Sequence, residues 1–398
     1  MKRILKATAA ASVMAGLAFA GPAAAESVDI GVVTTLSTPA AVIGNDMKNG
    51  MDLAVEHLNG QMHGLDINII YEDDEFNPET GKQRTDKLVL EDDVDFVTGF
   101  IWSHVLLASA GSVLDEGKIL ISANAGPSQL AGAECNENFF STSWQNDQTP
   151  MALGEVLNQR GVESLYVMAP NYAAGQNMVA GVERTFAGEI LGRDLTRWGA
   201  DAQLDFSAEL AKVRRSGAEG LFIFYPGRAG GAFMRQYQQA GLADEVPLYT
   251  VFTVDSISLP RFQEAGMDGV MGTFSTSFWS PDLDNESNRR FVADFRERYG
   301  RYPSHYAAQS YDSIMLINSA VQAVDGSISD INAVREGLSA ADYASVRGSY
   351  TYGNNHFPIQ NFYLREVAED ADGNWTTQVV DTVFENHQDT YASECALQ

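Results

Sequence analysis

The sequence predicts an α/β fold made of two similar units, each with a parallel β-sheet. Three observations lead to this prediction. Short apolar segments alternate with amphipathic ones, the alternation starts again near residue 164, and no flexible linker or short repeat interrupts it. The chain has 398 residues, of which 45% are hydrophobic and 20% charged. This composition supplies a sizeable core and excludes global disorder.

The first unit begins with an apolar, β-branched run at 27–35, SVDIGVVTT, which predicts a strand. Apolar residues at helical spacing follow from Met47 to Leu58, and Asn59-Gly60 ends this helix. Further strands are expected at 65–71, 94–100 and 119–122, with helices at 79–90 and 103–116. This order predicts a parallel sheet with helices on both faces.

The second unit repeats the pattern. Strands are expected at 164–169, 194–198, 220–225 and 247–252, with helices at 176–190, 207–216 and 231–240. A segment at 269–275 leads out of the unit, helices return at 286–299 and 304–323, and alternating residues at 348–383 predict antiparallel strands. In open α/β sheets, ligands bind beyond the carboxyl ends of the strands. Two such units therefore predict a site in the cleft between them, suited to hinge closure.

The first 25 residues differ from the rest of the chain. Three positive charges at 2–6 precede a run of small apolar residues at 7–20, and Ala23-Ala24-Ala25 fits a cleavage site. This pattern predicts a cleaved signal peptide at 1–25 and export to the periplasm. The run is too short for a membrane span, and no cysteine follows it that would carry a lipid anchor.

The charge balance is strongly acidic. The chain has 26 Lys and Arg residues against 53 Asp and Glu residues, a formal net charge of −27. Such a surface repels nucleic-acid phosphates and anionic lipid headgroups, so a nucleic-acid-binding function is excluded. The same charge favours a soluble monomer.

The chain has two cysteines, Cys135 and Cys395. In an exported protein, an even pair predicts one disulfide, which here ties the C-terminal end to a loop near residue 135. Two separate free thiols are the alternative. Neither cysteine has the spacing of a metal or redox site.

Four segments carry a resemblance to a known family. They are IGVVTTLSTPAAVIGNDMKNGMDLAVEHLNG, FVTGFIWSH, ILISANAGPSQL and YGRYPSHYAAQSYDSIML. Their order resembles the leucine/isoleucine/valine-binding family, the type I solute receptors of ABC importers, over essentially the whole mature chain. The resemblance implies a type I periplasmic binding protein fold with two Rossmann-like lobes joined by three crossover strands. It also implies a membrane permease as partner and no cofactor.

The resemblance further implies the division of the chain. The crossovers are expected near 146–149, 274–278 and 348–352. Lobe one then comprises 26–147 plus 277–349, and lobe two comprises 148–276 plus 350–398, including a C-terminal extension.

In this family, the first lobe holds a solute carboxylate with a hydroxyl group and with backbone N–H groups at helix starts, where the helix dipole favours an anion. Two loops match this arrangement. Ser103 and His104 follow the third strand, and Asn124, Ala125 and Gly126 follow the fourth. A plain helix N-cap is an equal alternative for Ser103, and a polar wall residue is the alternative for His104.

In the second lobe, family members that bind α-amino acids pair the ammonium group with a carboxylate. The resemblance places Phe252 at that position, which favours a ring over an ammonium group. Asp255, three residues on, restores the acid under a different alignment.

Aromatic residues gather in the same loops. Trp102, Tyr172 and Tyr225 stand at or just after strand ends, where their rings are candidates to stack on an aromatic solute. Core packing is the alternative for each. Trp144 is interpreted as a hinge or core residue near a crossover, and Arg228 as part of the solvated rim.

The predicted function is capture of a small carboxylate solute for an ABC importer. The loops FNPETGKQ, FIWSH, PSQLAG and STSWQNDQT resemble the branch that binds aromatic carboxylates such as benzoate and hydroxycinnamate derivatives. The alternatives are a branched-chain amino acid or an amide as solute, a secreted α/β hydrolase, and a sensory domain. The sequence contains none of the motifs HExxH, GxSxG or GxGxxG after a strand, so no enzymatic activity and no metal are predicted.

Overall fold

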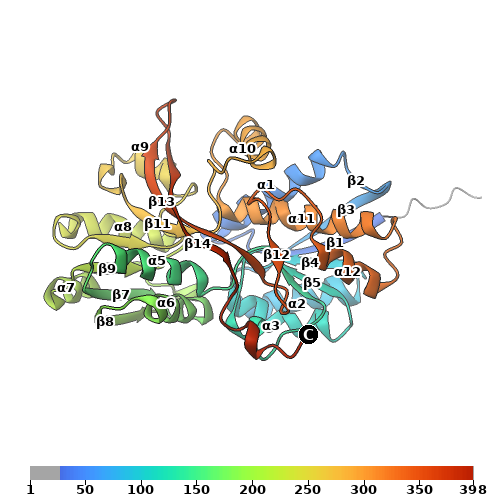
Figure 1. Cartoon of the computed structure of the whole chain (residues 1–398), viewed down its shortest axis with the longest axis horizontal. Helices are drawn as coiled ribbons and strands as arrows, with labels where there is room; N and C mark the ends of the chain where they lie inside the picture. Colours follow the sequence, from blue (N-terminus) through green and yellow to red (C-terminus); the bar gives the residue numbers. More distant parts are fainter. Residues whose placement is uncertain (1–26, 398) are drawn as a thin grey trace, which may run out of the picture.

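The computed structural model describes residues 27–397, and its chain forms two β-sheets that are covered by helices (Figure 1). The predicted signal peptide at 1–25 lies outside the described residues. The first sheet has the order β2-β3-β1-β4-β5-β6. Its strands are β1 (Ser27–Thr34), β2 (Gln61–Met62), β3 (Leu65–Asp73), β4 (Phe96–Gly99), β5 (Ile119–Ser122) and β6 (Phe139–Ser141). All neighbours are parallel except β2 and β3, as predicted for an α/β unit.

The second sheet has the order β12-β13-β11-β10-β9-β7-β8, and β14 pairs with β13. Its strands are β7 (Ser164–Pro170), β8 (Glu189–Thr196), β9 (Gly220–Ile223), β10 (Leu248–Thr250), β11 (Phe274–Ser277), β12 (Thr351–Tyr352), β13 (Pro358–Glu369) and β14 (Trp375–His387). The strands from β7 to β11 pair in parallel. The last three pair antiparallel, which confirms the prediction from the alternating residues at 348–383.

Helices cover both sheets, and in Figure 1 the blue and cyan strands of one half lie to the right of the green and yellow strands of the other. We call the six-stranded sheet and its helices the first lobe. These helices are α1 (Ala41–His57), α2 (Pro78–Leu90), α3 (Ser103–Leu114), α4 (Ser128–Ala131), α10 (Glu286–Tyr299), α11 (His305–Ala323) and α12 (Ile331–Ala340). The second lobe is the other sheet with its helices. These are α5 (Gln148–Gln159), α6 (Ala173–Thr185), α7 (Ser207–Ser216), α8 (Arg228–Gln239) and α9 (Leu259–Glu264).

Two neighbouring predictions have wrong bounds. The helix expected at 176–190 ends at Thr185, and the strand expected at 194–198 is β8, which spans Glu189–Thr196. The exposure of its residues alternates along this edge strand, because one side packs on the lobe while the other faces solvent. The strand is rich in charged residues, so its apolar pattern is too weak to separate it from the preceding helix.

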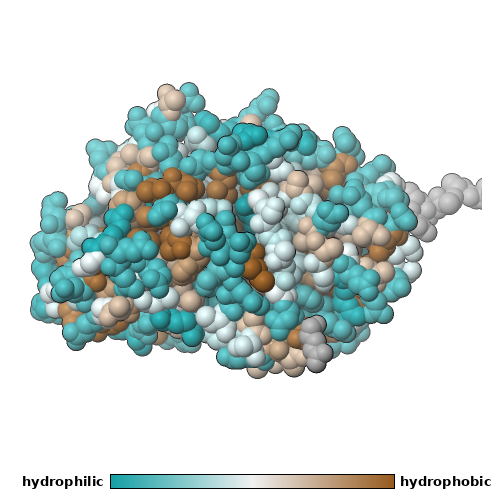
Figure 2. All heavy atoms as spheres, viewed as in Figure 1, coloured by the Kyte–Doolittle hydropathy of each residue, from teal (hydrophilic) through white to brown (hydrophobic). Residues whose placement is uncertain are grey.

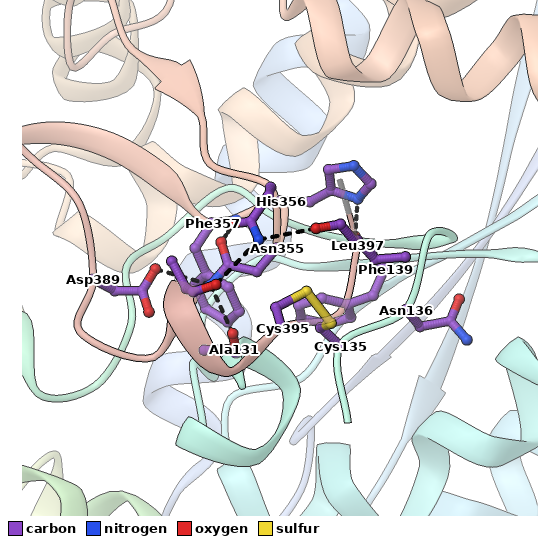
Figure 3. Close-up of a disulfide and its surroundings, with 12 residues drawn as sticks. Ala131, Cys135, Asn136, Phe139, Asn355, His356, Phe357, Asp389, Cys395 and Leu397 are labelled. Atoms are coloured by element: carbon purple, nitrogen blue, oxygen red, sulfur yellow. Dashed lines mark hydrogen bonds between the residues drawn. A yellow bond between two sulfur atoms is a disulfide. The ribbon is translucent and has the colours of Figure 1, made fainter. Parts of the chain in front are cut away.

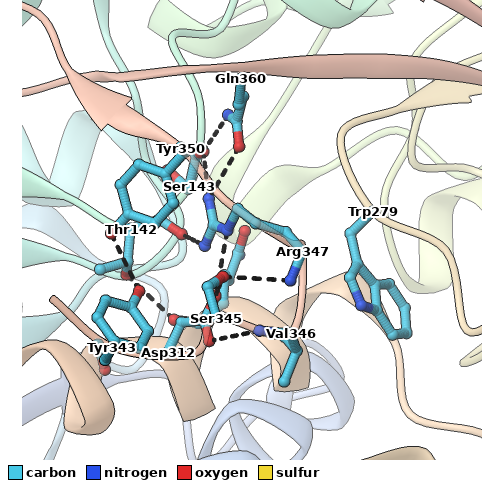
Figure 4. A network of polar contacts seen from close by, with 12 residues as sticks. Thr142, Ser143, Trp279, Asp312, Tyr343, Ser345, Val346, Arg347, Tyr350 and Gln360 are labelled. Atoms are coloured by element: carbon cyan, nitrogen blue, oxygen red, sulfur yellow. Dashed lines mark hydrogen bonds and ion pairs between the residues drawn. The ribbon is translucent and has the colours of Figure 1, made fainter. Parts of the chain in front are cut away.

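The chain passes between the lobes three times, at 142–147, 278–285 and 341–350. Arg347 in the third passage is buried and joins these parts (Figure 4). Its guanidinium donates to the carbonyl oxygens of Thr142 and Ser143 in the first passage, and to Gln360 of β13. It also pairs with the buried Asp312 of α11 at 3.1 Å. One side chain thus links two passages to elements of both lobes.

The predicted disulfide between Cys135 and Cys395 is present (Figure 3). It joins residues 260 positions apart in the sequence. The Asn354 side-chain amide also donates to the carbonyl oxygens of Ala392 and Leu397. The segment after β14 is therefore fastened to the loop after α4 in the first lobe.

One face of the molecule is mainly hydrophilic. On the face drawn in Figure 2, hydrophilic residues cover most of the surface and hydrophobic residues appear in small separate patches. Within residues 27–397, no helix has both the length and the apolar character needed to cross a bilayer.

Candidate ligand-binding cleft

A small cavity lies between the lobes, where loops from the carboxyl ends of both sheets meet. Its volume is about 20 Å³, roughly the space that one water molecule needs. The lining residues are Ile101, Trp102, Ser103, Asn124, Ala125, Trp144, Asn146, Tyr172, Ala174, Met178, Phe224, Pro226, Phe252 and Tyr306. Both lobes and the first passage contribute to this wall.

Six of the ten predicted ligand-binding residues line this cavity. They are Trp102, Ser103, Asn124, Ala125, Tyr172 and Phe252. Each follows the carboxyl end of a parallel strand, namely β4, β5, β7 or β10. Parallel strands deliver the residues after their ends to one edge of the sheet, which explains why these six residues lie together.

The first-lobe side of the cavity is built on the start of α3. Ser103 and His104 are its first two residues, so their backbone N–H groups have no carbonyl partner within the helix. The Asn146 side-chain amide donates to Ser103 Oγ at 3.1 Å. The Asn124 amide donates to the carbonyl oxygen of Ile101 at 2.6 Å. This side presents hydrogen-bond donors at the positive end of a helix dipole.

Trp102 is held by a buried chain of hydrogen bonds. Its indole Nε1 donates to Thr35 Oγ1 at 2.8 Å, and that hydroxyl donates to Asp74 at 2.6 Å. Burial raises the pKa of Asp74 to about 6. The ring lies 4.3 Å from the ring of Phe76, measured between centroids. The indole plane is thus fixed from two sides.

Trp144 lies on the cavity wall, although its position near a passage suggested a hinge or core role. Its ring is 4.5 Å from the ring of Phe252. Its indole Nε1 is buried and has no hydrogen-bond partner within residues 27–397. Phe252 has a φ of 53°, a left-handed conformation that is uncommon outside glycine and is typical of functional loops.

His104 and Gly126 do not line the cavity, but they contact residues that do. The His104 ring is 5.4 Å from the ring of Tyr172. Burial lowers the pKa of His104 to about 4, so the imidazole is neutral near pH 7. The Gly126 N–H donates to Asn146 Oδ1, and a Cβ at Gly126 would lie 1.9 Å from the carbonyl oxygen of Trp144. Gly126 therefore permits the close approach of the first passage.

The structure does not bring Tyr225 to the cavity. The Tyr225 ring is buried in the second-lobe core against Phe206 and Phe233, and its hydroxyl lies 3.0 Å from Thr196 Oγ1. The preceding residue, Phe224, lines the cavity instead. Successive side chains of an extended segment point to opposite faces, so the two neighbours have opposite environments.

Asp255 faces a different part of the cleft. One carboxylate oxygen accepts hydrogen bonds from the backbone N–H groups of Ile257 and Ser258. Burial raises the pKa of this carboxyl group to about 6. At the cavity itself, the second lobe presents Phe252, so the structure places a ring rather than an acid there.

A larger pocket adjoins the small cavity and shares Trp102 and Pro226 with it. We call it the aromatic pocket. Its volume is about 290 Å³. Three rings line it, from Phe76, Trp102 and Trp198, and their centroids lie between 4.3 and 5.7 Å apart. The sequence interpretation missed Trp198, whose only signal was an aromatic residue at the end of a short predicted strand.

The small cavity is electrically neutral. Its lining includes no Asp, Glu, Lys or Arg residue. Burial raises the pKa of Tyr172 and Tyr306 above the ordinary value, so both phenols stay protonated. Within the described part of the chain, no group of three or more His, Cys, Asp or Glu residues is arranged to hold a metal ion.

The chain is similar to known solute-binding proteins in both sequence and structure. Residues 27–374 match the family model described as periplasmic binding protein. "Leu/Ile/Val-binding protein homolog 6" of Brucella abortus is 27% identical over 402 residues, covering 98% of each chain. A solute-binding protein of an ABC transporter from R. palustris, solved with benzoate, is 27% identical with a TM-score of 0.85, covering 93% of this chain and all of that one.

A second solved structure shows the same fold. It is a solute-binding protein of an ABC transporter from Rhodopseudomonas palustris BisB5 with 3,4-dihydroxybenzoic acid, at 23% identity and a TM-score of 0.83. The alignment covers 92% of this chain and 99% of that chain.

Proposed function

This chain belongs to the periplasmic binding protein family and is a solute-binding protein of an ABC transporter, and we propose that its solute is a small aromatic carboxylate. The proposed class of ligand rests on one observation. The small cavity is lined by aromatic rings from both lobes and by no charged side chain. The benzoate-bound relative supports the proposal. The family binds solutes without converting them, so the hydrolase alternative is set aside.

In this proposal, the hydrogen-bond donors at the start of α3 bind the carboxylate of the solute. The backbone N–H groups of Ser103 and His104 and the hydroxyl of Ser103 supply hydrogen bonds without a formal charge. The unpartnered Nε1 of Trp144 adds one more donor. The ring of the solute packs against Tyr172 and Phe252 from the second lobe.

A branched-chain amino acid or an amide is the second candidate. It is favoured by the similarity to the Leu/Ile/Val-binding protein homolog of Brucella abortus. An α-amino acid carries an ammonium group, which is costly to desolvate without a carboxylate partner. The cavity offers none, because its lining includes no carboxylate and Asp255 lines a different pocket of the cleft. The aromatic acid, which needs no such partner for an ammonium group, is therefore the first candidate.

Capture requires the lobes to separate, because a cavity of about 20 Å³ does not admit a benzene ring. In this proposal the lobes are 26–147 plus 277–349 and 148–276 plus 350–398, and they rotate about the three passages. A solute that touches both lobes only in the closed form shifts the equilibrium toward closure. The closed monomer then delivers its solute in the periplasm to a membrane permease.

A thermal-shift screen tests the ligand class. Benzoate, 4-hydroxybenzoate and coumarate are expected to raise the melting temperature, because a ligand that binds only the folded state stabilises it by mass action. Leucine and urea are expected to leave it unchanged. Stabilisation by leucine without stabilisation by any aromatic acid contradicts the proposal.

The role of Trp144 is tested by the variant Trp144→Phe, which keeps a ring and removes the Nε1 donor. We expect it to weaken benzoate binding about tenfold, the effect of one lost hydrogen bond to a charged group. Tyr225→Phe is the matched control, since the Tyr225 ring lies outside the cavity. Isothermal titration calorimetry measures both. Equal affinities for the two variants contradict the assignment of Trp144.

A further inference from the structure

Three pockets follow one another along the cleft. The small cavity meets the aromatic pocket at Trp102 and Pro226. The aromatic pocket in turn shares Pro39, Gly227 and Arg228 with a third pocket of about 470 Å³. The three pockets therefore lie next to one another, in order from the start of α3 past the three rings to the third pocket.

Arginines define the third pocket, which we call the arginine pocket. Arg228 and Arg235 are seven residues apart in α8, which puts them on the same face of the helix two turns apart. Gly231 lies between them and adds no side chain to that face. Arg261 lines the same pocket from α9. The three side chains are exposed and line one hollow.

These arginines share two features: they line one hollow, and none of them has an acidic partner in the described part of the chain. Within residues 27–397, none of the three forms an ion pair, whereas every lysine in that range and most other arginines do. The chain carries 53 acidic residues against 26 basic ones, so acidic partners are abundant. Three unpaired guanidinium groups around one hollow thus form a local positive site on an acidic protein.

Two carboxylates lie close to this path. Asp255 lines the arginine pocket, but one of its oxygens accepts the N–H groups of Ile257 and Ser258. Glu75 lines the aromatic pocket and is exposed. Three guanidinium groups outnumber the single carboxylate of the arginine pocket, and the N-terminal end of α8 at Arg228 adds partial positive charge.

We propose that the arginine pocket binds a second anionic group of the solute, so that the preferred ligand is an elongated aromatic dicarboxylate. One carboxylate lies at the start of α3, and the ring packs against Tyr172 and Phe252 as in the proposed function. The body of the solute extends from there past Phe76 and Trp198, and the distal carboxylate meets Arg235 and Arg261. Guanidinium groups bind carboxylates through paired hydrogen bonds, which suits them to this role. The position of the ring rests on the proposed function, whereas the anion site rests on the arginines alone.

Matched ligands test this proposal. Tryptophan fluorescence titrations compare 4-carboxycinnamate with 4-methylcinnamate, which has a similar shape and lacks the second charge. We expect the dianion to bind wild-type protein about tenfold or more tightly than the monoanion. In Arg235→Ala/Arg261→Ala this ratio is expected to fall to about one, while the affinity for 4-methylcinnamate is unchanged. Arg215→Ala, which removes an exposed arginine of α7 outside these pockets, is the control.

The outcomes separate this inference from the proposed function. A ratio near one in wild type, or an unchanged ratio in the double variant, overturns the anion site. An unchanged ratio together with lost transport in cells assigns the arginines to an acidic partner protein instead. If neither cinnamate binds, but adipate binds and is lost in the double variant, the anion site stands and the aromatic ligand class fails. If adipate does not bind either, both proposals fail.

Discussion

At the scale of single residues, the cleft is built from groups that stay uncharged. His104 is the clearest example. In an unfolded chain a histidine titrates near pH 6.5, but burial in the folded protein lowers the pKa of His104 to about 4. The imidazole therefore contributes hydrogen-bonding capacity and ring contacts near neutral pH without adding charge to the carboxylate site.

This shift predicts a pH dependence of stability. Between pH 6.5 and 4 the unfolded chain binds a proton at His104 that the folded protein does not bind, so stability is lost as the pH falls through this range. His104→Gln removes this contribution. We expect the variant to lose about 1–2 kcal/mol less unfolding free energy than wild type between pH 7 and pH 5. Urea unfolding at the two pH values measures the difference.

His63→Gln is the control for this prediction, because His63 is exposed in a turn. It should show the same loss between the two pH values as wild type. Parallel losses in wild type and in His104→Gln would show that His104 binds its proton in the folded protein as easily as in the unfolded chain.

The sequence predicts which residues follow a strand end, but it does not predict the direction of their side chains. Trp102 follows a strand end, and the family resemblance placed Ser103 and Phe252 in the same region; all three line the small cavity. Tyr225 and Phe224 are sequence neighbours after β9 and share every local signal, yet only Phe224 lines the cavity. The direction of an aromatic side chain depends on the register of its strand with both layers of the lobe, which the local sequence does not contain.

At the scale of elements, close helix packing depends on particular glycines. Helices α1 and α11 lie against each other in the first lobe. Gly50 of α1 faces α11, and a Cβ at this position would lie 2.2 Å from the carbonyl oxygen of Ala307. No backbone atom can yield by that amount without moving the helix.

We therefore expect Gly50→Ala to destabilise the protein by about 1–3 kcal/mol through overpacking. The matched control is Gly111→Ala in α3. Gly111 is exposed, and its added Cβ would approach only the Asp115 carboxylate, at 3.5 Å. In the control, alanine's better helix propensity is expected to add up to about 1 kcal/mol. Urea denaturation compares the two, and stabilisation by both substitutions would show that α1 and α11 are free to separate.

At the scale of the whole molecule, the passages between the lobes carry a buried network around Arg347 (Figure 4). Arg347 and Asp312 are both buried. Burial raises the pKa of the Asp312 carboxyl group, and the Arg347 guanidinium partly offsets this increase. Since Arg347 also holds the carbonyl groups of Thr142 and Ser143, its loss affects two passages together.

Arg347→Met leaves the carboxylate of Asp312 buried without its cation. We expect a loss of about 3–5 kcal/mol of unfolding free energy, and partial recovery in Arg347→Met/Asp312→Asn. The control is Lys82→Met, which breaks the exposed pair with Asp86 and is expected to cost about 0.5 kcal/mol or less. Chemical denaturation measures all three variants. Similar losses for Arg347→Met and Lys82→Met would contradict a structural role for the buried network.

The class of fold, most element positions, the disulfide and the loops that meet at the cleft could be predicted from the sequence. These features follow from local periodicity, from strand ends and from two cysteines, which are all written in consecutive residues. Three features could not be predicted in this way: Trp144 and Trp198 line the cleft, Asp255 lines a different pocket from Phe252, and three arginines surround one hollow. Those features depend on how two lobes and three passages come together, and the residues involved are far apart in the chain.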